Sequence, residues 1–156
     1  MKPYHRKSSL DDLTYLWLHI RYEDQREVET LGRSVEQSLA LGFGNSQICR
    51  TIIDNRGRVV GIYGVVPLSD KCGQVWMLGT EGLVEIKTAF LKQSRSEVEG
   101  MNSVYPHLCN FIDSRNEVHL KWIKWCGFKI LGEKVINNVK FYEVCRLALF
   151  HTKCYS

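Results

Sequence analysis

The chain has 156 residues, of which 44% are hydrophobic and 24% charged, with a formal net charge of +4 and a pI near 8.7. This length fits one domain over residues 1–156, and the near-average composition argues against disorder. The charge is too mild for a dedicated nucleic-acid binder, so we do not expect a nucleic-acid partner.

No CxxC or HxxxH spacing links the six cysteines, which stand at positions 49, 72, 109, 126, 145 and 154. We therefore expect reduced structural thiols and no metal site. The chain opens on no secretory leader, and no apolar run approaches the roughly 20 residues of a membrane span. Neither a disulfide-forming compartment nor a membrane span is expected.

The first third of the chain predicts one strand followed by helices. A short strand over residues 1–6 precedes Ser9, which can cap a helix with apolar residues at helical spacing. Those apolar residues are Leu10, Leu13, Trp17 and Ile20. A second, polar helix covers residues 21–30, and a third begins at Ser34 and ends near Gly42. The acidic residues Glu23, Asp24, Glu27 and Glu29, between Arg21 and Arg26, predict a solvated face with ordinary ion pairs.

The middle of the chain changes to strand patterns. Residues 48–54 and 58–66 predict two strands joined by a turn at 55–57. The second of these is apolar on both faces, which predicts a central place in a sheet. Residues 73–78 predict another strand, and Thr80 can cap a long helix that reaches about residue 98.

The last third predicts a strand over 106–113, an amphipathic helix over 116–126 and a closing hairpin of strands 128–136 and 139–150. Trp122 and Trp125 share one stripe of the helix with Val118, so both are expected in the core. The predicted order is β-α-α-β-β-β-α-β-α-β-β. It indicates an α/β (α+β) fold with a mixed sheet of about six or seven strands flanked by helices.

The most specific motif runs from Asn110 to Phe128. Asn110, Asp113 and Asn116 mark the strand-to-helix step, and the Trp-rich helix closes on Gly127-Phe128. This motif and the element order resemble the Gcn5-related N-acetyltransferase (GNAT) fold. In closer detail, residues 64–147 resemble a tailed-phage family that includes the internal virion (core) protein of short-tailed coliphages.

The GNAT resemblance implies strands splayed at a central cleft that can take an acyl-CoA arm. It gives as candidate cleft residues Met77, Leu78, Gly79, Thr80, Gly82 and Asn116. The family holds the pyrophosphate with Gln/Arg-x-x-Gly-x-Gly/Ala, but within residues 79–84 only Gly82 fits, while Glu81 adds negative charge and Val84 adds bulk. Ile123 stands where many GNAT enzymes carry an acid Tyr, so no catalytic residue is assigned.

Three further polar residues allow two roles each. Asp113 is expected to cap the helix or its preceding turn, whereas Asn116 suits capping and cleft contact equally. His119 has no carboxylate at matched spacing, so a general-base role is not favoured.

Three functions compete. The first is a phage-encoded binding module, in the virion or the infected host cytoplasm, whose partner is a virion or host protein. The second is an acyl-CoA-dependent N-acyltransferase with a diverged phosphate loop, and the third is a small-ligand sensor. The first needs no cofactor, whereas the second requires acetyl-CoA or another acyl-CoA.

Overall fold

The computed structural model describes residues 2–86 and 88–148, and its seven strands form one sheet in the order β1-β2-β3-β4-β5-β7-β6. The strands are β1 (Tyr4–Lys7), β2 (Ile48–Ile53), β3 (Val59–Pro67), β4 (Cys72–Gly79), β5 (His107–Asp113), β6 (Lys129–Ile136) and β7 (Val139–Leu147). The helices are α1 (Leu10–His19), α2 (Tyr22–Thr30), α3 (Val35–Asn45), the 3-10 helix η1 (Glu81–Glu85), α4 (Thr88–Val104) and α5 (Glu117–Trp125). Neighbouring strands run antiparallel except β4 and β5, which run parallel, so the predicted mixed sheet is confirmed.

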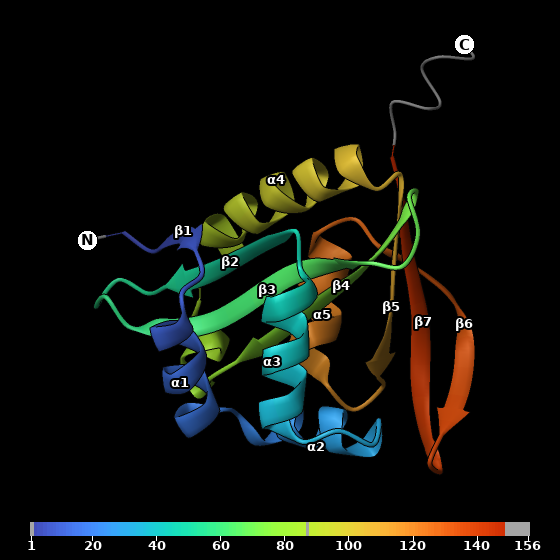
Figure 1. Cartoon of the computed structure of the whole chain (residues 1–156), viewed down its shortest axis with the longest axis horizontal. Coiled ribbons are helices and arrows are strands. Elements are labelled where there is room, and N and C mark those ends of the chain that lie inside the picture. The colour runs from blue at the N-terminus through green and yellow to red at the C-terminus, as the bar shows by residue number, and fades with distance from the viewer. Residues whose placement is uncertain (1, 87, 149–156) are drawn as a thin grey trace.

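Helices cover both faces of the sheet (Figure 1). They bury two apolar clusters. On one face, α1, α2 and α3 pack Leu16, Val28 and Leu39 against Ile62 and Leu78. On the other face, the larger cluster joins side chains of α4 and α5 to β3, β4 and β5. Strand β3 lies between β2 and β4 and is buried along most of its length, as its apolar sequence predicts.

The predicted helix from Ser34 is confirmed, with Ser34 and Gln37 in a capping box. Three helices therefore separate β1 from β2, one more than the predicted element order contains. The long helix predicted from Thr80 is wrong. Thr80 caps only the short η1, because Ile86 takes an extended conformation (φ −70°, ψ 129°) and ends it. Helix α4 therefore begins at Thr88 and runs to Val104.

The apolar stripe predicted for α1 is only partly right. Leu16 is fully buried, with Leu13 and Ile20 packed beside it, whereas Leu10 and Trp17 are 70% and 49% exposed. Trp17 follows Leu16 and so points about 100° away around the helix. The outer surface of α1 is therefore unusually apolar.

The closing hairpin forms as predicted. Asn137 and Asn138 both have positive φ, 48° and 65°, which suits a two-residue hairpin turn. Strand β7 ends at Leu147, and the residues of the predicted strand after 148 lie outside the described part. The five cysteines of the described part are free thiols. Among the described residues, no helix has the length and apolar character needed to cross a membrane.

Candidate functional site

The site is built around a gap between the parallel strands β4 and β5. Their register pairs only Cys72 to Gln74 with His107 to Cys109, although β4 continues to Gly79 and β5 to Asp113. The predicted splay is thus confirmed. Backbone groups on the facing edges of the two strands lose their strand partner beyond Gln74, and each must find another.

The segment that joins α1 to α2 takes the place of the missing strand at the end of β4. The backbone N–H of Arg21 donates to the Gly79 carbonyl at 2.9 Å, next to a β-bridge between Ile20 and Thr80. The Gly79 N–H in turn donates to Asp24 Oδ2 at 2.7 Å. Both backbone groups of Gly79 are therefore occupied by the N-terminal helices.

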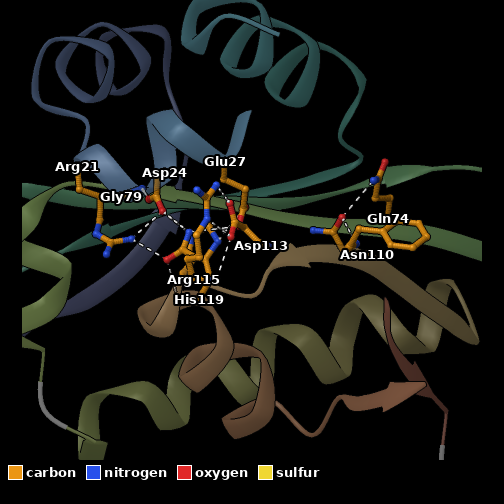
Figure 2. A network of polar contacts seen from close by, with 11 residues as sticks. Arg21, Asp24, Glu27, Gln74, Gly79, Asn110, Asp113, Arg115 and His119 are labelled. Carbon is orange, nitrogen blue, oxygen red and sulfur yellow. Dashed lines mark hydrogen bonds and ion pairs between the residues drawn. The ribbon is translucent and has the colours of Figure 1, made fainter. Parts of the chain in front are cut away.

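The end of β5 is held by the same helix. Glu27 Oε2 accepts the backbone N–H of Asp113 at 3.0 Å. Because Asp24 and Glu27 lie three residues apart on one face of α2, their carboxylates reach the ends of both strands (Figure 2). Helix α2 thus closes the wide end of the gap.

These carboxylates correct the expectation of a solvated acidic face. Asp24 is 0% exposed and Glu27 is 6% exposed, whereas Glu29 at the end of the helix is exposed as predicted. The signal that was missed is the spacing Arg-x-x-Asp-x-x-Glu from Arg21 to Glu27. It places one basic and two acidic side chains along a single helical stripe.

His119 lies between the two carboxylates, which corrects the expectation that it has no acidic partner. Its Nε2 is 3.2 Å from Asp24 Oδ1, and its Nδ1 is 3.3 Å from Glu27 Oε1. Both partners come from α2, far from His119 in sequence, so no local spacing could reveal them. A histidine with a carboxylate at each nitrogen is held in place by two ion pairs.

The charge of His119 follows from this setting. Burial lowers the pKa of the imidazole, but Asp24 and Glu27 outweigh burial and raise the pKa to about 10. Burial likewise raises the pKa of Asp24, and the positive charges of His119 and Arg21 outweigh it and lower the pKa. His119 is therefore an imidazolium at neutral pH, without the lone pair that a general base requires.

Asn116 joins the charged groups to the start of α5. Its side chain caps the helix by accepting the His119 N–H at 3.5 Å, and it also accepts Arg21 Nη1 at 3.1 Å. Its Nδ2 donates to Asp24 at 2.9 Å and to Glu27 at 3.3 Å. Asn116 thus caps α5, which is one of the two roles expected of it, whereas helix capping by Asp113 is not observed.

Asp113 has the second of its two expected roles, in the turn that precedes the helix. It accepts the backbone N–H of Arg115 at 2.9 Å and pairs with the Arg115 guanidinium at 2.7 Å. These bonds hold the turn between β5 and α5. They also keep the pKa of Asp113 low despite burial.

We call Arg21, Asp24, Glu27, Asn116 and His119 the gap cluster. Its two cations balance its two carboxylates, so every charge is paired without solvent. Among the described residues, no group of three or more His, Cys, Asp or Glu side chains is arranged to hold a metal ion. The gap cluster is therefore a closed ionic network.

The candidate phosphate loop is also explained by packing. A Cβ on Gly82 would lie 2.6 Å from Val60 Cγ1, and the Gly82 N–H already donates to Thr80 Oγ1 at 3.1 Å. A Cβ on Gly79 would similarly lie 2.6 Å from Leu83 Cδ2. The glycines therefore allow η1 to pack closely on β3.

The predicted cleft residues do not share one cavity. Met77 and Leu78 line a pocket of about 320 Å³ on the α2–α3 side of the gap, together with Glu27 and His119. Gly82 instead lines a separate cavity of about 730 Å³ beside the β2–β3 turn. Gly79 and Asn116 are linked through Asp24 and Arg21, each of which is bonded to both.

The predicted structural motif is part of the framework around the gap. Trp122 is buried and meets Tyr63 edge-on at 5.5 Å between ring centroids. Trp125 is half-buried and donates its indole N–H to the Leu91 carbonyl at 2.9 Å. Gly127 follows the end of α5 and has a positive φ of +89°. Phe128 is buried in the core. The Asn110 side chain is bonded to Gln74 at 3.2 Å.

Comparison with solved structures identifies the fold. A GNAT-family acetyltransferase from Bacillus anthracis superposes with a TM-score of 0.68 and 8% identity, covering 95% of this chain and 96% of that chain. The ribosomal-protein-S5-alanine acetyltransferase from Vibrio fischeri gives 0.64 and 15%, over 95% and 94%. Spermidine/spermine N-acetyltransferase from Vibrio cholerae gives 0.62 and 11%, over 99% and 98%.

No protein-family model matches the chain, and no curated protein matches its sequence. The superposed structures show that the architecture is that of the GNAT acetyltransferases. At these identities the likeness concerns the fold alone, so function has to be argued from the site.

Proposed function

We propose that this GNAT-fold chain acts by binding another protein and does not transfer acetyl groups from acetyl-CoA. The observation that carries the proposal is the gap cluster, which occupies the ends of β4 and β5. In the GNAT resemblance this gap takes the acyl-CoA arm. Here its backbone donors at Gly79 and Asp113 are already bonded to carboxylates.

Opening the gap for a cofactor would be costly. Moving Asp24 and Glu27 aside would leave the buried His119 without a counter-charge and the buried Arg21 with Glu23 alone. Breaking a buried ion pair typically costs about 3–5 kcal/mol. The loop that follows β4 offers few favourable contacts to the cofactor. Its Glu81 repels a pyrophosphate, and its Gly82 N–H is engaged by Thr80.

The groups that acetyl transfer uses are also unfavourable. A base must remove a proton from the acceptor amine, and His119 is already protonated. An acid or water must protonate the departing thiolate, and the side chain of Ile123 has no proton to give. A site that lacks both a base for the acceptor amine and an acid for the thiolate is better suited to recognition than to catalysis.

The resemblance to the phage family supports a virion or host protein as the partner. The Asn-x-x-Asp-x-x-Asn step and the Trp-rich helix resemble the internal virion proteins of short-tailed phages. We therefore propose a component of a phage virion core or a modulator of a host protein, in the virion or the infected bacterial cytoplasm. Co-purification of the chain with intact phage particles tests the virion location.

An acyl-CoA-dependent N-acyltransferase is the second candidate. The solved structures with this fold include enzymes that are named for the acetylation of spermidine and of a ribosomal-protein alanine. The pocket beside Met77 and Leu78 would then receive the acceptor amine. This candidate requires helix α2 to move away from the gap when the cofactor binds.

Titration with acetyl-CoA separates the two candidates. A ligand at a hundredfold excess over its Kd adds roughly 2.7 kcal/mol to the stability of a folded protein. We expect no saturable heat in calorimetry and no shift of the thermal midpoint at millimolar acetyl-CoA. A low-micromolar Kd, with acetylation of a peptide or polyamine that Gly82→Pro abolishes, would establish the enzyme.

A further inference from the structure

The gap remains open on the α2–α3 side, where the pocket of about 320 Å³ lies within the size range of ligand sites. Its rim carries Leu31, Leu41 and Leu68, and Trp76 and Phe111 also line it. We call it the leucine-rimmed pocket. The three leucines are 41%, 46% and 56% exposed, a concentration of apolar surface typical of a binding site.

Trp76 gives the pocket a fixed apolar wall. Its indole N–H donates to Ser46 Oγ at 2.8 Å, so this donor is not offered to a ligand. Its ring packs against α3 at Gly42, where a Cβ would lie only 2.7 Å from ring carbons. A side chain that enters the pocket therefore meets a preformed apolar surface.

A pair of amides supplies one donor and one acceptor. Gln74 Nε2 donates to Asn110 Oδ1 at 3.2 Å, and the two side chains lie side by side at the narrow end of the gap (Figure 2). This bond leaves Gln74 Oε1 and Asn110 Nδ2 without partners among the described residues. A peptide group, with its own N–H and C=O, matches that arrangement.

Charge at the pocket favours an acidic group. Glu27 is neutralised within the gap cluster by His119. Arg33 is exposed at the pocket and forms no ion pair within the described part of the chain. The pocket therefore presents apolar walls, two amide groups and one free positive charge.

We propose that the leucine-rimmed pocket binds a segment of a partner protein in which a large apolar side chain adjoins an acidic residue. The apolar side chain lies between Trp76 and the rim leucines, the peptide group meets Gln74 and Asn110, and the acidic group pairs with Arg33. This proposal rests on the proposed binding function and assigns it a surface.

Two probes test the pocket. One is 1-anilinonaphthalene-8-sulfonate, an aromatic anion that brightens on apolar surfaces. The other is the acetylated and amidated tripeptide Ala-Phe-Asp, with Ala-Phe-Lys as its charge-reversed counterpart. We expect saturable dye emission from the folded protein, displaced by the Asp peptide at a concentration about tenfold lower than the Lys peptide requires.

Exposed positions provide matched variants that keep the fold. Leu41→Asp and Leu68→Asp should weaken dye binding about tenfold or more, and Arg33→Glu about fivefold. The controls are Leu18→Asp on α1, where the leucine is 67% exposed, and Arg56→Glu at the separate cavity. Both controls should leave dye binding within about twofold of the wild type.

Several outcomes would overturn the assignment. Absence of saturable dye emission excludes an apolar anion site, and loss of binding in Leu18→Asp but not in Leu41→Asp moves the site to α1. Equal displacement by the two peptides removes the acidic partner. Acetyl-CoA titration of the same samples keeps the proposals apart, because tight acetyl-CoA binding overturns the binding function whatever the dye shows.

Discussion

The two parts of the β4–β5 gap show opposite solutions to one structural problem. At the wide end, the gap cluster inserts charged side chains between the strands and pairs every one of them. On the α2–α3 side, the leucine-rimmed pocket leaves apolar side chains and two amides facing solvent. The charged groups therefore hold the fold together, and the apolar surface is the part available for recognition.

This comparison reverses the usual expectation for an acyltransferase fold. Titratable groups in a cleft are commonly functional, and structural ion-pair networks perturb pKa values as well. In the gap cluster, the residues with shifted pKa values, Asp24 and His119, are buried and paired with each other. Substitutions at the gap cluster should thus change stability, and substitutions at the leucine-rimmed pocket should change binding.

The largest expected effect is that of Asp24→Ala. Removing this carboxylate leaves two buried cations with Glu27 as the one buried counter-charge, and it leaves the Gly79 N–H without an acceptor. We expect a loss of about 3–5 kcal/mol in the free energy of unfolding, measured by urea denaturation. Glu29→Ala on the same helix is the control and should change stability by less than about 0.5 kcal/mol. Similar losses in the two variants would show that the cluster is not structural.

Gly82→Ala distinguishes packing from phosphate binding. The added methyl lies against Val60 and should cost about 1–3 kcal/mol, as overpacking does. In the Val60→Ala background the same change should cost clearly less, because the clash is gone. Equal costs in both backgrounds, measured by the same denaturation, would leave this glycine without a packing role.

Stability should fall as pH rises above neutrality. The folded-state pKa of His119, about 10, lies above its ordinary value of 6.5, so its stabilisation is complete below pH 6.5 and is lost as pH approaches 10. The slope from this one group is at most about 1.4 kcal/mol per pH unit. Urea titrations from pH 6 to 9 measure this slope. We expect His119→Gln to flatten the pH profile of stability and the exposed-site control His107→Gln to leave the profile unchanged. A wild-type profile already flat would mean that the imidazole is neutral.

The smallest effect on stability is expected at the pocket rim. Leu41→Asp alters an exposed side chain and should change the free energy of unfolding by less than about 0.5 kcal/mol. Thermal denaturation checks this value beside the dye titration. A loss comparable to that of Asp24→Ala would show that the rim leucines belong to the core.

Local patterns predicted most of the framework. The two-faced apolar run of β3, the Asn137-Asn138 turn and the Trp122 stripe each depend on neighbours in sequence, and all three are confirmed. The start of α4 was wrong because one extended residue, Ile86, ends η1, and no local residue type marks that conformation.

The gap cluster was beyond local patterns. Asp24 and Asn116 are bonded to each other across 92 positions of sequence, and each residue alone suits a solvated helix or a helix cap. Their role appears only when the sheet opens between β4 and β5 and brings α2 against α5. The Arg-x-x-Asp-x-x-Glu stripe was the one available clue.

Amide NMR of Gly79 and Asp113 during acetyl-CoA titration tests the closed gap most directly. Both N–H groups donate to buried carboxylates, so we expect strongly downfield signals, slow exchange with solvent and no change as acetyl-CoA reaches millimolar concentration. Saturable shifts of both signals would contradict closure, because they would mean that acetyl-CoA displaces Asp24 and Glu27 from the ends of β4 and β5.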